Sequence, residues 1–225
     1  SGSGAARKRV IDSLDNILSI LPAHVPRQEV WTFPAPVTNE GILTASNVQY
    51  VIRGGNYGEA GYQWDGKMMV LNQVLTTDWL QTRIRVMGGA YGGFASISPS
   101  GTIYFSSYRD PNLSATLETF SDTPSYLASF EADPRTMTRY IIGTIAGLDT
   151  PLTPDQQADR AFQHFLTGKT AEMAQIERDA VLSATEADIR NFSGMVSEIM
   201  NQNIHCVYGH AETIKKEAKL FNRLV

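Results

Sequence analysis

The chain has 225 residues, of which 42% are hydrophobic and 19% are charged, and its formal net charge is −4. This length and composition indicate a globular protein whose core needs neither disulfides nor metals. Charges of both signs are scattered, and the longest apolar run, at residues 140–145, is far too short to span a bilayer. We therefore expect neither a nucleic-acid surface nor a membrane anchor.

The first part of the chain combines a helix with extended segments. It opens Ser-Gly-Ser-Gly without a methionine, so residues 1–4 are expected to be a linker or cloning remnant. Apolar residues at helical spacing predict a helix over residues 5–22. Residues 28–54 are expected to be extended. Two strands are predicted there, one around Val30, Trp31 and Phe33 and one around the alternating residues Val48, Tyr50 and Ile52, ending at Gly54-Gly55.

The middle of the chain predicts a buried helix and a hairpin. Residues 67–82 carry apolar side chains on a wide face, which is typical of a buried helix. A glycine-rich stretch, residues 88–93, follows. Alternating residues over 94–107, with a turn at Ser100-Gly101, then predict a β-hairpin.

The last half of the chain is mainly helical in pattern. Gly168 is expected to end one helix, Ile204 to Tyr208 to form a last strand, and residues 210–222 a final helix. Candidate helix starts lie at Asp122, Asp133, Thr153, Thr170 and Thr185. Strands followed by many helices indicate an α+β fold, with a mostly antiparallel sheet and helices packed on one face. We expect a single domain over residues 5–225.

The histidines and the cysteine do not form a recognisable metal site. The four histidines are His24, His164, His205 and His210, and they match neither His-Glu-x-x-His nor its inverse. Adjacent residues of a strand point to opposite faces, so His205 and Cys206 could not share an ion. We expect no metal ligands in this chain. Cys206 is expected to be an inert, buried thiol, and a lone cysteine fits a reducing compartment.

The glycine-rich stretch lacks the spacing of a phosphate loop, but it separates two side chains of interest. Arg85 and Tyr91 would lie about 20 Å apart in an extended chain. A bend with positive φ at Gly88 and Gly89 could bring them together, where a guanidinium and a phenol would donate to a developing oxyanion. A surface arginine and a tyrosine packed beside a turn would explain the same residues.

One family shares this stretch. Arg85-Val86-Met87-Gly88-Gly89-Ala90-Tyr91-Gly92-Gly93-Phe94 resembles a signature of the presequence proteases, which belong to the pitrilysin and insulin-degrading-enzyme clan of zinc peptidases. The resemblance continues through residues 106–112, 141–145 and 149–154. It identifies the chain as similar to the C-terminal domain of such an enzyme, with a fold like that of pitrilysin and mitochondrial processing peptidase domains.

The resemblance implies a function for the intact enzyme. Four related domains form two halves around a chamber for unstructured peptides, and the zinc ligands lie in the N-terminal domain. This chain would contribute Arg85 and Tyr91, with Gly88 and Gly89, to substrate binding, and the Arg85 and Tyr91 side chains to stabilising the tetrahedral intermediate. Its partners would be the zinc-bearing N-terminal domains, and it would be inactive alone. The expected compartment is the bacterial cytoplasm, or else an organellar matrix. The alternative is a non-catalytic scaffold or interaction domain of the same clan.

Overall fold

The fold is described from a computed structural model, which covers residues 3–22, 29–32 and 37–225. The chain divides into two compact units. The first comprises Ser1–Pro36 with Leu152–Gln163, and the second comprises Val37–Pro151 with His164–Val225.

The described part of the first unit contains two exposed helices. Helix α1 spans Gly4–Ile20, and the Ser3 hydroxyl caps it by accepting a hydrogen bond from the amide of Ala6 at 3.3 Å. The described part of the expected linker therefore takes part in the helix. Helix α6, Pro154–Thr167, lies mostly in this unit and begins where the Thr153-Pro154 signal predicts. Neither helix buries a residue.

The first of the two predicted strands does not form in the described residues. Val30 and Trp31 have no regular structure and are exposed. Phe33, the third residue of that prediction, lies outside the described residues. An apolar cluster alone does not make a strand when no neighbouring strand pairs with it, because the backbone groups must find partners.

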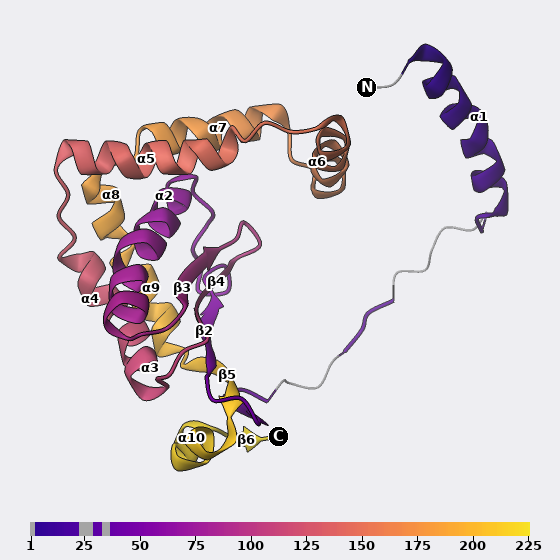
Figure 1. The fold of residues 1–225 in the computed structure, drawn as a ribbon. Helices are drawn as coiled ribbons and strands as arrows, with labels where there is room; N and C mark the ends of the chain where they lie inside the picture. Colours follow the sequence, from indigo (N-terminus) through magenta and orange to yellow (C-terminus); the bar gives the residue numbers. More distant parts are fainter. Residues whose placement is uncertain (1–2, 23–28, 33–36) are drawn as a thin grey trace. The chain divides into compact units, whose positions relative to one another are not determined.

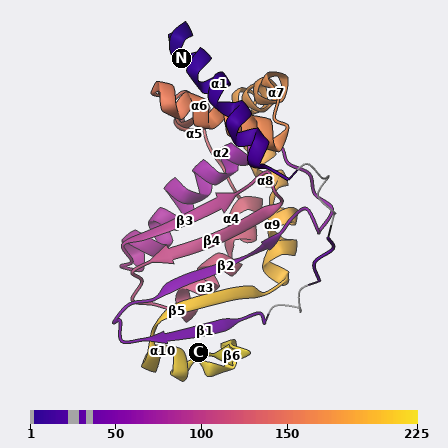
Figure 2. The same ribbon diagram turned by 90° about the vertical axis from the view of Figure 1, so that its right-hand side faces the viewer.

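The second unit is built on one mixed sheet, seen face-on in Figure 2. Its strand order is β3-β4-β2-β5-β1-β6. The pairs β3·β4, β4·β2 and β2·β5 are antiparallel, whereas β1 runs parallel to both β5 and β6. The strands are β1 Glu40–Thr44, β2 Tyr50–Asn56, β3 Gly92–Ile97, β4 Thr102–Tyr108, β5 Ile204–His210 and β6 Arg223–Leu224.

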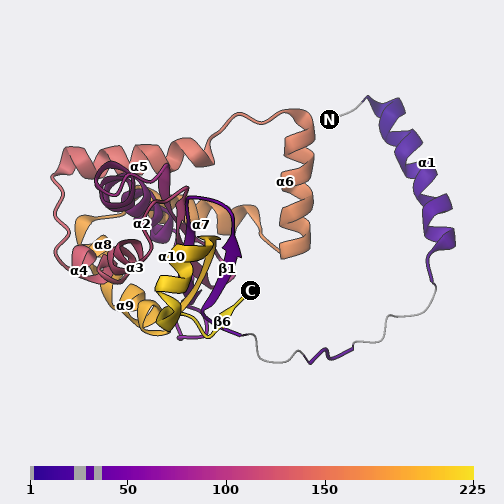
Figure 3. The same cartoon turned by 60° about the horizontal axis from the view of Figure 1, so that its bottom comes forward.

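Helices of the second unit cover one face of this sheet (Figures 1 and 3). Helix α2 runs directly into a π-helix, η1, and α5 and α7 pack on α2 as an outer layer. The α+β prediction with helices on one face is confirmed. The helices of this unit are α2 Lys67–Val74, η1 Leu75–Met87, α3 Ser114–Ser121, α4 Thr123–Ala128, α5 Pro134–Leu148, α7 Ala171–Leu182, α8 Glu186–Asn191, α9 Ser193–Asn201, α10 Ala211–Lys216 and the 3₁₀-helix η2 Ala218–Leu220.

The core lies between the sheet and these helices. Strand β4 shows why: Ile103 and Phe105 are buried on the helix side, whereas Tyr104 and Tyr108 alternate with them and are exposed. Phe105 packs against Phe120 of α3, with ring centroids 5.8 Å apart. The period of two that predicts the hairpin therefore also separates the covered face from the open face.

Helix caps predicted from the sequence are mostly present. Asp133 accepts a hydrogen bond from the amide of Thr136 at 2.9 Å, and Thr170 caps α7. Asp122 is the exception, because its side chain makes no capping bond.

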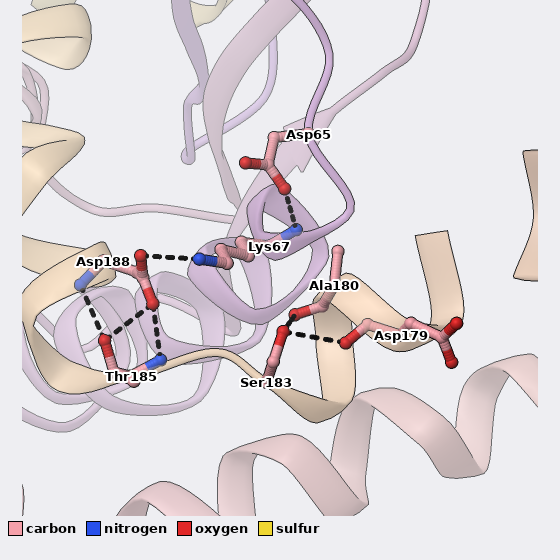
Figure 4. A network of polar contacts seen from close by, with 7 residues as sticks. All are labelled: Asp65, Lys67, Asp179, Ala180, Ser183, Thr185 and Asp188. Atoms are coloured by element: carbon pink, nitrogen blue, oxygen red, sulfur yellow. Dashed lines mark hydrogen bonds and ion pairs between the residues drawn. The ribbon is translucent and has the colours of Figure 1, made fainter. Parts of the chain in front are cut away.

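The Thr185 cap is joined to the start of α2 by an ion pair (Figure 4). Thr185 and Asp188 form a capping box at the start of α8. Asp188 also pairs with the ammonium group of Lys67 at 2.7 Å, and Asp65 accepts a hydrogen bond from the Lys67 amide. This network ties α8 to the first turn of α2 in the second unit.

Candidate functional site

Arg85 lies in the last turn of the π-helix η1, with its side chain exposed. The predicted helix over 67–82 is therefore too short, because helical structure continues to Met87. The reason lies in packing: Leu80 and Ile84 are both buried, which extends the apolar face of the helix beyond the predicted end. π-Helical segments are rare in proteins, and those that occur often lie at functional sites.

The glycine turn folds the chain back after Arg85. The amide of Gly89 donates to the carbonyl of Arg85 at 3.0 Å, and the amide of Ala90 donates to the carbonyl of Ile84 at 3.1 Å. Gly89 has a φ of 76°, whereas Gly88 remains right-handed at −82°. The bend with positive φ therefore occurs, but at one of the two glycines.

Tyr91 follows this turn and leads into β3. Its amide donates to the carbonyl of Tyr108 at 3.0 Å, and its side chain is 69% exposed. Close packing of β3 on η1 fixes this position, because a Cβ at Gly93 would lie 2.8 Å from the Cβ of Ile84. Arg85 and Tyr91 thus sit on the two sides of one tight turn, rather than at the ends of an extended segment.

A buried polar group supports the turn from the other side. The Asn112 side-chain amide donates to the carbonyl of Gly88 at 2.7 Å. Asp110, which is fully buried, accepts hydrogen bonds from the backbone amide of Asn112 at 2.9 Å and from the Thr116 hydroxyl at 2.6 Å. Sequence reasoning did not assign a role to Asn112. The signal was the Asp-Pro-Asn sequence after a strand, which is typical of a side chain that binds nearby backbone.

No group of three metal-ligating side chains occurs within residues 3–22, 29–32 and 37–225. His205 is 5% exposed, and its Nε2 lies 2.9 Å from the carbonyl oxygen of Leu220. Burial raises the pKa of the Cys206 thiol, and the Glu40 carboxylate adds to this. These residues do not fit a catalytic zinc, which needs three protein ligands around one ion.

The burial of His205 predicts that the free energy of unfolding depends on pH. Burial lowers its pKa from the usual value near 6.5, the Leu220 carbonyl opposes this, and Arg53 adds to the lowering. Below pH 6.5 the unfolded chain therefore binds a proton that the folded chain excludes. We expect the free energy of unfolding to fall as the pH is lowered from about 6.5 to 5.

Urea denaturation across this pH range measures the effect, with His205→Gln as the test. The free energy of unfolding of the variant should change less with pH than that of the original chain, whatever its value at pH 7. Carboxylates whose pKa is lowered by hydrogen bonds, such as Asp133 and Asp149, titrate below about pH 4 and leave this window clear. A slope unchanged by the substitution would contradict the assignment.

Solved structures define the class of fold. The M16 peptidase inactive domain from Pseudomonas fluorescens superimposes with a TM-score of 0.60 at 12% identity, over 90% of this chain and 50% of that one. Pitrilysin superimposes with a TM-score of 0.55 at 14% identity, over 91% of this chain and 23% of that one. The second unit's sheet, covered by helices on one face, thus has the fold of pitrilysin-type peptidase domains.

Sequence comparison then gives the family. Residues 39–209 match the model of the PreP C-terminal domain, and the chain belongs to that family. It is 42% identical to Protein HypA of Clostridium perfringens over 197 residues, which are 88% of this chain and 20% of that protein. It is 33% identical to Presequence protease 1, chloroplastic/mitochondrial, of Arabidopsis thaliana over 216 residues, 95% of this chain and 20% of that protein.

These relatives confirm the resemblance to presequence proteases. The chain spans about a fifth of the length of these two curated relatives. Among the helices that the structure describes, none combines the length and the apolar character needed to cross a membrane.

Proposed function

We propose that this chain is the C-terminal, metal-free part of a zinc peptidase that cleaves unstructured peptides. In this proposal Arg85 and Tyr91 bind the substrate backbone and stabilise the tetrahedral intermediate. The observation that carries it is the turn: Gly89 folds back on the Arg85 carbonyl, so that exposed guanidinium and phenol groups lie on the two sides of one bend.

The chemistry follows from the two side chains. A guanidinium keeps its charge at every pH of interest and offers several donors in a planar fork. A phenol offers one donor on a stiff ring. Donors of this kind act on an oxyanion best when they are held in place before the reaction, because no reorganisation is then needed. The Asn112 bond to the Gly88 carbonyl supplies such support beneath the turn.

The rest of the active site is proposed to come from elsewhere in the parent protein. Among the described residues the chain has no zinc ligand set, so the metal would be held by the N-terminal domains. Those domains are the proposed partners, and this chain alone is expected to be inactive. The relatives come from a bacterium and from plant organelles, and Cys206 is the single cysteine. We accordingly propose the bacterial cytoplasm, or an organellar matrix, as the compartment.

Reconstitution tests the proposal. A quenched fluorogenic peptide is incubated with this chain alone, with the rest of the parent chain plus zinc, and with both together. We expect cleavage only in the full mixture, and its loss when a chelator removes the zinc. Cleavage by this chain alone would reveal a catalytic centre that the proposal lacks.

A scaffold role is the second candidate. Its support is the fold likeness to a structure described as an inactive M16 peptidase domain. In that case the full mixture would not cleave the peptide, although both parts are folded. A mixture that forms a stable complex without cleavage would favour the scaffold.

A further inference from the structure

The sheet face that the helices of the second unit leave open carries a line of aromatic rings, which we call the tyrosine row: Tyr91, Tyr108, Tyr50 and Tyr208. Successive ring centroids are 5.8, 5.3 and 5.6 Å apart, each pair meeting edge to face. The row crosses β4, β2 and β5, because Tyr50 pairs with Tyr208 in the sheet register and Gly92, next to Tyr91, pairs with Tyr108. Tyr108 and Tyr208 are 41% and 47% exposed.

Rings are unusual on an exposed sheet face. An antiparallel sheet covered on one side ordinarily has polar residues on the other. Here Ile52 and Phe94 are also exposed beside the row, whereas Val51, next to Ile52, is fully buried on the helix side. The sheet therefore carries apolar side chains on both faces: one set forms the core and the other is exposed. Contiguous exposed apolar surface of this kind marks a binding site.

A β-bulge adds a cation to this face. Ile52 pairs with Ser106 and Gln49 bridges to Asp110, so the four residues Gln49–Ile52 oppose the five residues Ser106–Asp110. Arg109 is the extra residue, and its φ of 50° is left-handed. Bulges redirect side chains, often beside functional sites.

The redirected Arg109 side chain lies along the tyrosine row. Its guanidinium carbon is 5.8 Å from the centre of the Tyr108 ring. A hydrogen bond to the Tyr50 phenol raises the pKa of Arg109. Glu40, which pairs with Cys206 on the same face as Ile52, forms an ion pair with Arg223, so the guanidinium of Arg109 is the charge beside the tyrosine rings.

We propose that the tyrosine row and Arg109 bind an extended segment of a peptide, with apolar or aromatic side chains over the rings and a carboxylate beside the guanidinium. This proposal rests on the proposed function, because the row begins at Tyr91 and so continues directly from the turn that would hold the scissile bond. Three ring-to-ring steps span about five residues of extended chain. Tyrosine suits this task, since its stiff ring gives a large contact area and its hydroxyl can bond to backbone.

Direct binding tests the proposal without catalysis. A fluorescein-labelled, Gly/Ser-rich peptide carrying two Phe and one Asp is titrated with the 225-residue chain, and anisotropy gives Kd. Tyr50→Ala with Tyr208→Ala should raise Kd by about tenfold or more, as the loss of tyrosine anchors does at interfaces. Tyr208→Ala alone should give a smaller increase. Circular dichroism and urea denaturation verify folding of each variant.

Two matched comparisons sharpen the result. Tyr62→Ala removes a tyrosine that bonds to Glu198, outside the row, and should leave Kd unchanged. Replacing the Asp of the peptide by Lys should weaken binding to the original chain by about fivefold or more, and Arg109→Gln should abolish this preference, because the charged contact is gone.

Three outcomes overturn the proposal. One is an equal Kd for the original chain and the folded tyrosine variants. Another is a concentration-dependent dimer in sedimentation that the row variants abolish, since the occupant is then a second copy. The third is displacement of the labelled peptide from this face by the rest of the parent chain. Unchanged cleavage in both Arg85→Ala and Tyr91→Phe, together with lost binding in the row variants, would instead overturn the proposed roles of Arg85 and Tyr91 and leave the binding proposal standing.

Discussion

Replacing Arg85 by alanine in the reconstituted or full-length enzyme should lower peptide turnover by about 10- to 1000-fold, the usual cost of losing one donor to an oxyanion. The variant should remain folded, because the Arg85 side chain is exposed and the turn is bonded through the backbone carbonyl of Arg85, which accepts from the amides of Gly88 and Gly89. Tyr91→Phe should have an effect in the same range, since it removes the hydroxyl and keeps the ring contact with Tyr108.

Steady-state rates of cleavage, measured over a range of concentrations of the fluorogenic peptide, give kcat and KM separately. A loss mainly in kcat indicates a contact made in the transition state, whereas a rise in KM alone indicates uniform binding. Arg83→Ala is the matched control, because Arg83 lies on the same helix and contacts the Trp79 ring, 5.1 Å away. If both Arg85→Ala and Tyr91→Phe cleave at the original rate, the proposed roles are wrong.

Phe105→Ala should lower the free energy of unfolding by about 3–5 kcal/mol, the range seen when a buried phenylalanine is truncated. Phe105 is fully buried between the sheet and α3, where its ring meets Phe120. The substitution leaves a cavity that surrounding residues fill only partly, and both lost burial and lost contacts contribute.

Tyr104→Ala is the matched control for Phe105→Ala, because it truncates the adjacent residue of the same strand on the open face. Tyr104 is 38% exposed, so its loss should cost much less. Urea denaturation of both variants by circular dichroism measures the difference. Equal losses would mean that the open face contributes to the core as much as the covered face does.

Local chemistry explains which elements were predictable. The β3–β4 hairpin, strand β5 and the caps at Asp133, Thr170 and Thr185 follow from alternation, glycine turns and hydrogen bonds within a few residues. Strand β1 lies within the segment 28–54 that was predicted to be extended, but it was not singled out as a strand, because it is short and is held by parallel pairing with β5 and β6, far along the chain. The final helix predicted over residues 210–222 is shorter in the structure, because α10 ends at Lys216 and the chain continues through the 3₁₀-helix η2 into β6, which pairs with β1.

The candidate site likewise has parts that local sequence predicts and parts that it does not. Gly88 and Gly89 were expected to form the bend, and the turn does form, with positive φ at Gly89. Arg85 lies beyond the predicted end of the helix at residue 82, and the structure places it in helix, because the buried Ile84 extends the apolar face. The tyrosine row could not be anticipated, because it brings Tyr50 and Tyr208 together from strands that are distant in the sequence.

The π-helix η1 determines the direction in which Arg85 leaves the helix. Its i→i+5 hydrogen bonds place more residues in each turn than the 3.6 of an α-helix. Each residue of a π-helix therefore rotates the chain by less than the ~100° of an α-helix, so Arg85 leaves η1 in a direction that α-helical bonding over the same residues would not give. The number of residues in η1 therefore specifies the side on which the guanidinium emerges. In engineering this domain, the length of the segment should be held fixed even where its exposed side chains are changed.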